Sequence, residues 1–136
     1  MLMEHLTQLT PMLQTLDIAK TIAFYTKILD FQVAGSWPNE NPVWCMLQRD
    51  GARLMFMVNE HVGEPRLSGT LYIQTTDVLA LHERIAPHVE VQWGPEVYEY
   101  GMHEFAIKDC NGYTISFGQP VDPEDDQAPK ESAGES

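Results

Sequence analysis

The residue types most able to bind a metal or move protons are widely spaced in this chain. Its five histidines are His5, His61, His82, His88 and His103. His61 lies in a predicted linker and His82 on a predicted helix, so surface or loop positions are the simplest interpretation. His103 and Glu104 are neighbours in a predicted strand, where successive side chains point to opposite faces. We therefore do not expect that pair to chelate one ion.

Other catalytic spacings are missing from the sequence as well. No Ser-His-Asp arrangement or glycine-rich phosphate loop is supported by spacing. Cys45 and Cys110 lie in a predicted strand and a predicted turn without metal-ligand spacing, which indicates free thiols.

Aromatic and thioether side chains are instead frequent on the predicted strands and loops. They are Trp37, Trp44, Trp93, Tyr98, Tyr100, Phe105, Met55 and Met57. Filling the core is the simplest role for each one alone. Together they also suit the stacking of a flat apolar ligand.

The charge of the chain is −12, and it is unevenly distributed. Six acids and one lysine follow residue 119, so the tail carries −5 and the body −7. Segment 120–136 is rich in proline and poor in apolar residues, and we expect it to be an acidic disordered tail. This balance disfavours nucleic-acid binding. It fits either simple solubility or the attraction of cationic ligands.

Two predicted β-hairpins organise the body. Residues 105–117 form two strand-type runs around Asn111-Gly112, a pair suited to a tight turn. Residues 44–56 repeat this pattern around Asp50-Gly51. Alignment of the two turns on their glycines makes Trp44 the counterpart of Phe105.

The segments before each hairpin also repeat. An edge strand within 6–16 precedes a helix over 18–29 that Asp17 caps. Sixty positions later, segment 70–77 precedes a helix over 78–85 that Asp77 caps.

Each predicted helix is followed by further strands. In the first half these are 31–33, then 43–49 and 52–58 after a loop at 36–42. In the second half, residues 89–93 and 97–100 are expected to form one strand that is interrupted at Gly94-Pro95. Segment 61–68 links the halves.

Each half is thus β-α-β-β-β, and the predicted fold class is α+β with two paired βαβββ modules. We expect a single domain over 1–119, with modules at about 6–60 and 69–119, followed by the tail at 120–136. The longest strongly apolar run is 54–58, and no signal peptide is apparent. A cytoplasmic protein without a membrane partner is therefore expected.

The stretches LDIAKTIAFYTKILDFQV and YGMHEFAIKDCNGYTISFGQ resemble the vicinal oxygen chelate superfamily, over roughly residues 6–119. That superfamily includes glyoxalase I, extradiol dioxygenases and the fosfomycin- and bleomycin-resistance proteins. The resemblance implies curved sheets around a cavity, usually in a homodimer. Asp30 stands where a glycine is common, which is tolerable because aspartate visits the left-handed region. His103 stands where the bleomycin-resistance branch often has arginine.

The resemblance also implies positions for metal ligands, and this chain lacks suitable donors there. The first-strand positions fall on Thr10 and Thr70, and the last-strand positions fall on Met55 and Ser116. None offers an imidazole or a carboxylate. We therefore expect no metal and no cofactor.

The leading hypothesis is a metal-free small-molecule binding protein of the bleomycin-resistance type, an antibiotic-resistance class, that sequesters a planar or cationic ligand as a homodimer. The expected ligand-binding residues are Trp44, Met55, Trp93, Tyr100, Phe105 and Ser116, with Trp37 as a lid. One alternative is a metal-dependent lyase, isomerase or dioxygenase of the same superfamily. Another is a structural or regulatory dimer with a vestigial cavity.

Overall fold

The computed structural model describes residues 3–121, so the predicted tail lies outside the described residues from residue 122 onward. The chain divides into two compact units, and the boundary between them follows Pro65. That boundary falls inside the linker predicted at 61–68. Among residues 3–121, no helix has the length and apolar character needed to cross a membrane.

The first unit is one four-stranded sheet with one helix. Its elements are β1 (Met12–Gln14), α1 (Ile18–Lys27), β2 (Gln32–Trp37), β3 (Trp44–Arg49) and β4 (Ala52–Met57). The strand order is β1-β4-β3-β2, with β1 parallel to β4 and the other pairs antiparallel. The short β1 is therefore an edge strand, as the proline beside it predicts.

The second unit repeats this arrangement. Its elements are β5 (Leu71–Gln74), α2 (Val78–Ile85), a 3₁₀ turn (Ala86–His88), β6 (Glu90–Val97), β7 (Met102–Lys108) and β8 (Thr114–Pro120). The strand order is β5-β8-β7-β6, which is the same topology. The predicted α+β fold with two βαβββ modules is confirmed.

Aspartates fix the local geometry where the sequence predicts. Asp17 and Asp77 each accept a backbone N–H, from Lys20 and Ala80, and so cap α1 and α2. Asp30, which ends the first helical segment, has a φ of 58° and adopts the left-handed conformation expected of it.

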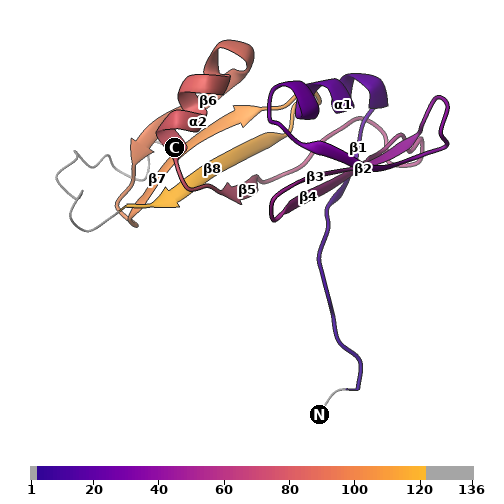
Figure 1. Ribbon diagram of the computed structural model, residues 1–136, viewed down its shortest axis with the longest axis horizontal. Coiled ribbons are helices and arrows are strands. Elements are labelled where there is room, and N and C mark those ends of the chain that lie inside the picture. The colour runs from indigo at the N-terminus through magenta and orange to yellow at the C-terminus, as the bar shows by residue number, and fades with distance from the viewer. Residues whose placement is uncertain (1–2, 122–136) are drawn as a thin grey trace. The chain divides into compact units, whose positions relative to one another are not determined.

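One face of each sheet packs against its own helix (Figure 1). In the first unit, Tyr25 of α1 lies 5.2 Å from Phe56 of β4, measured between ring centroids. In the second unit, His82 of α2 lies 5.0 Å from Phe105 of β7, and Phe105 lies 5.2 Å from Phe117. Side chains alternate along a strand, so the strand residues next to Phe56, Phe105 and Phe117 point to the side of the sheet away from the helix. We call that side the helix-free face of each sheet.

Strand β6 differs from its prediction. The sequence predicts an interruption at Gly94-Pro95, but the strand is continuous from Glu90 to Val97. Its pairing with β7 shifts register between Trp93 and Glu96 instead. The extra residues form a bulge on an edge strand, which tolerates a proline because its N–H is not needed by a neighbour.

Candidate functional site

The helix-free face of the first sheet carries thioether and indole side chains. Met55 of β4 pairs with Met12 of β1 and with Met46 of β3, which sets three methionines in one row across the sheet. In the next row Met57 pairs with Trp44. Met46, Met55 and Met57 are only partly buried, so this surface is apolar, polarisable and accessible.

The Trp44 ring lies against the backbone of the neighbouring strand β2. A Cβ added at Gly35 of β2 would stand 3.5 Å from two carbons of the Trp44 ring. Trp37 pairs with Trp44 at the end of the sheet and is 66% exposed. The first sheet thus offers one indole embedded among methionines and a second indole at its rim.

The helix-free face of the second sheet combines small residues with large polar ones. Ala106 of β7 pairs with Trp93 and with Ser116, and Glu104 pairs with Glu96 and with Gly118. Ser116 in turn pairs with Tyr72 of β5.

The central feature of this face is a buried carboxylate between two tyrosines. Glu104 is 5% exposed, and its two oxygens accept hydrogen bonds of 2.7 Å from Tyr72 and 2.8 Å from Tyr100. Gly118 permits this contact, because a Cβ there would collide with the Tyr72 hydroxyl. The Tyr100 ring also stacks on Tyr98, with centroids 5.6 Å apart.

This environment shifts the ionisation of the tyrosines and of a nearby histidine. Burial, and then the hydrogen bond to Glu104, raise the pKa of Tyr100 to about 12 and also raise the pKa of Tyr72. Burial lowers the pKa of His103, which favours its neutral form. His103 and Glu104 point to opposite faces, as predicted for neighbouring strand residues.

The tyrosine shifts predict a loss of stability at alkaline pH. A raised folded-state pKa means that the unfolded chain loses its tyrosine protons first. The contribution of these tyrosines to the stability of the fold is therefore complete below about pH 10, and it declines as the pH rises through about 12. Glu104→Gln should move the tyrosinate absorbance titration of Tyr72 and Tyr100 toward the ordinary value. Glu83→Gln, at an exposed helical position, is the control because it removes the same charge, and it should leave that titration unchanged.

The predicted ligand-binding residues do not all lie on the same side of their sheets. Trp44, Met55, Trp93 and Ser116 lie on helix-free faces, and Tyr100 joins the Glu104 cluster. Phe105 is 0% exposed and faces α2, which is the position of a core residue. We therefore leave Phe105 out of the binding surfaces described below.

The strand pairing also changes the neighbours of the family's metal positions. Beside Met55 on β1 lies Met12 rather than Thr10, and beside Ser116 on β5 lies Tyr72 rather than Thr70. Thr10 and Thr70 both precede their strands. Met12 and Tyr72, the neighbours that the structure shows, are neither histidines nor acids. Within residues 3–121, no group of three or more histidines, cysteines or acids is placed to hold a metal ion.

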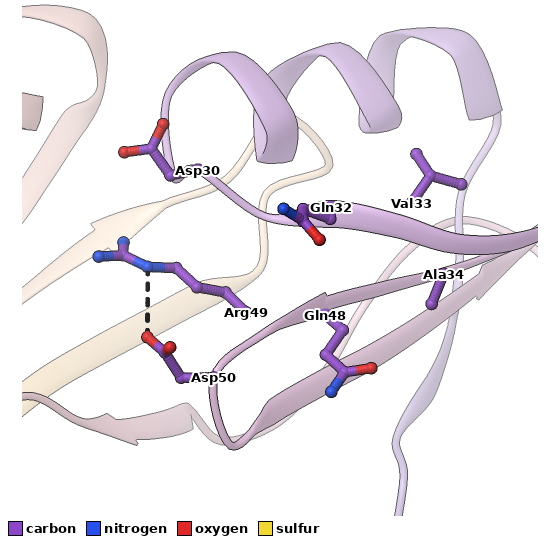
Figure 2. Close-up of a pocket in the computed structure, with 7 residues that line it drawn as sticks. All are labelled: Asp30, Gln32, Val33, Ala34, Gln48, Arg49 and Asp50. Atoms are coloured by element: carbon purple, nitrogen blue, oxygen red, sulfur yellow. Dashed lines mark ion pairs between the residues drawn. The ribbon is translucent and has the colours of Figure 1, made fainter.

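A separate polar pocket of about 610 Å³ lies beside β2 and β3 of the first unit. Figure 2 shows its lining residues, Asp30, Gln32, Val33, Ala34, Gln48, Arg49 and Asp50. Arg49 donates to the carbonyl of Leu29 at 3.0 Å and lies 3.7 Å from the Asp50 carboxylate. Its charge is thus already engaged in joining the end of the helical segment to the hairpin, which indicates a structural role.

Solved structures share this fold at low sequence identity. TnmS3, described as an antibiotic binding protein from Streptomyces sp. CB03234, has a TM-score of 0.73 and 23% identity, covering 87% of this chain and 99% of its own. TioX from Micromonospora sp. ML1 has a TM-score of 0.71 and 15% identity, covering 85% and 99%. A glyoxalase/bleomycin resistance protein/dioxygenase from Nocardioides has a TM-score of 0.70 and 16% identity, covering 90% and 88%.

No match was found among curated proteins. The family model described as Glyoxalase/Bleomycin resistance protein/Dioxygenase superfamily matches residues 3–117, which is most of the chain. The matched segment contains the first module and all of the second except the last three residues of β8 (Thr114–Pro120). The chain therefore belongs to the glyoxalase/bleomycin resistance protein/dioxygenase superfamily.

Proposed function

We propose that this protein binds a flat small molecule, neutral or cationic, through aromatic and thioether side chains on the helix-free faces of its sheets. The observation that carries the proposal is the first sheet's surface, where Trp44 lies among Met46, Met55 and Met57. An indole ring stacks on flat rings and attracts cations, and thioethers adapt to irregular apolar shapes. Such a surface suits sequestration better than acid–base chemistry.

Charge supports a preference for neutral or cationic ligands. The body of the chain carries a formal charge of −7 when the tail's −5 is taken from the total of −12. The second sheet adds carboxylates to its helix-free face at Glu96 and Glu104. An anionic ligand would meet repulsion from both sources.

The relatives indicate a class of ligand to try first. TnmS3 is described as an antibiotic binding protein, and it shares the fold of this chain. Natural-product antibiotics with fused aromatic rings have the shape and polarity that the Trp44 surface would accept. Antibiotic sequestration is thus one form of the proposed function.

Trp44→Ala is expected to weaken the binding of a flat probe by about five- to thirtyfold, because one stacking contact contributes roughly 1–2 kcal/mol. Isothermal titration with acridine, 9-aminoacridine and acridine-9-carboxylate provides the measurement without relying on tryptophan emission. Leu79→Ala, at an exposed position on α2, is the control and should bind like the wild type. Binding of the carboxylate alone, or equal binding by the Trp44 variant, would contradict the proposal.

The homodimer and the lack of a bound metal stay predictions. Sedimentation at micromolar concentration tests the first, and elemental analysis after dialysis tests the second. Stoichiometric metal held by residues of the helix-free faces would favour the lyase, isomerase or dioxygenase alternative.

A further inference from the structure

Two buried polar atoms on the helix-free face of the second sheet lack a hydrogen-bond partner among residues 3–121. They are Oε2 of Glu96, an acceptor, and Nε1 of Trp93, a donor. Folded proteins pair nearly all buried polar groups, because an unpaired one retains the cost of its lost hydration. These two atoms therefore suit a partner from outside the described chain.

The bulge in β6 brings the two side chains to the same face. Trp93 pairs with Ala106 and Glu96 pairs with Glu104 on β7. Ala106 and Glu104 are two positions apart and so share a face, which places Trp93 and Glu96 side by side. Without the extra residue between them, side chains three positions apart would point to opposite faces. The bulge thus aligns an indole donor with a carboxylate acceptor.

Glu104 cannot supply the donor that Glu96 lacks. Both of its oxygens already accept hydrogen bonds, from Tyr72 and Tyr100. An ionised carboxylate offers no proton, and two ionised carboxylates directly opposite each other repel. A positively charged group with N–H bonds would both relieve this repulsion and donate the hydrogen bond that Glu96 lacks.

We propose that Glu96 and Trp93 recognise a protonated amine or amidine on the edge of a flat aromatic ligand. Glu96 accepts a hydrogen bond from the ligand cation, while Nε1 of Trp93 donates to an acceptor atom beside it. Ala106 pairs with Trp93 and Ser116 pairs with Ala106, so the positions beside the indole carry small side chains. This inference rests on the proposed function and names the ligand class for the second sheet.

The test compares two probes that differ in this one group. Acridine is a neutral ring at neutral pH, and 9-aminoacridine is the same ring with a protonated amine system. Each is titrated by calorimetry into wild type, Glu96→Gln and Glu99→Gln. Glu99 is an exposed residue three positions along the chain, so its substitution removes the same charge without touching the Glu96–Trp93 pair.

The expected result is that Glu96→Gln weakens 9-aminoacridine binding by about tenfold or more and leaves acridine binding unchanged. Glu99→Gln should change neither by more than about twofold. Equal loss for both probes would indicate a structural role for Glu96 and overturn the inference. An equal effect of the two substitutions, or none from Glu96→Gln, would overturn it too. If neither probe binds wild type, the proposed function fails and this inference falls with it.

Discussion

Replacing Gly94 with alanine is expected to destabilise the second unit by about 2–5 kcal/mol, through backbone strain and steric conflict together. Gly94 has a φ of 77°, where an L-residue is strained. A Cβ at this position would also collide with the carbonyl oxygen of Glu104 and stand 2.9 Å from the Cα of Phe105. Both contacts are with backbone atoms, so no side-chain rotation can relieve them.

Gly101→Ala separates the two causes. Gly101 has a φ of 83°, and a Cβ there would meet nothing within 4 Å. This variant should show only the backbone strain, about 1–2 kcal/mol. Urea unfolding followed by circular dichroism gives both values. Equal losses for the two variants would show that steric conflict at Gly94 adds nothing to the backbone strain.

The features predicted from the sequence are those that depend on local signals. The caps at Asp17 and Asp77 and the positions of the hairpin turns each rest on residues close together in the chain, and the repeat of sixty positions is the recurrence of such local signals. Asp30 also adopts the left-handed backbone that its residue type allows. Two local features were predicted wrongly. Strand β2 continues to Trp37, beyond the strand predicted at 31–33, and β6 is continuous because Gly94-Pro95 is as compatible with a bulge as with a break.

The position of Phe105 shows how one residue in a turn reverses a prediction. Alignment on Gly51 and Gly112 makes Trp44 its counterpart, but the second turn is longer. Arg49 pairs with Ala52 across two residues, whereas the backbone N–H of Asp109 bonds to Tyr113 across three. The first strand of the second hairpin therefore aligns one residue earlier, and Phe105 corresponds to the buried Cys45. A one-residue shift moves a side chain to the other face.

The polar cluster of the second sheet could not be found from spacing alone. Tyr72 and Glu104 are thirty-two positions apart, and their contact depends on the parallel pairing of β5 with β8. It also depends on Gly118, whose missing side chain admits the Tyr72 hydroxyl. The available signal in the sequence was an acid, Glu104, directly before the apolar run Phe105-Ala106-Ile107 of a predicted strand.

Phe105→Ala is expected to lower the free energy of unfolding by about 3–5 kcal/mol, as for other large side chains deleted from a core. Phe105 is 0% exposed and contacts rings from two elements, His82 of α2 and Phe117 of β8. Its removal therefore opens a cavity between the sheet and its helix. Thermal and urea unfolding measure the loss.

Phe105→Leu distinguishes a core residue from a ligand-binding residue. Leucine keeps most of the apolar volume but has no ring, so the variant should fold with a loss of only about 1 kcal/mol. Because Phe105 faces α2, the affinity for acridine should stay within about twofold of wild type, in contrast to the loss expected for Trp44→Ala. A folded Phe105→Leu protein that bound acridine as weakly as the Trp44 variant would return Phe105 to the binding surface. It would also show that ligand contacts reach the side of the sheet that α2 covers.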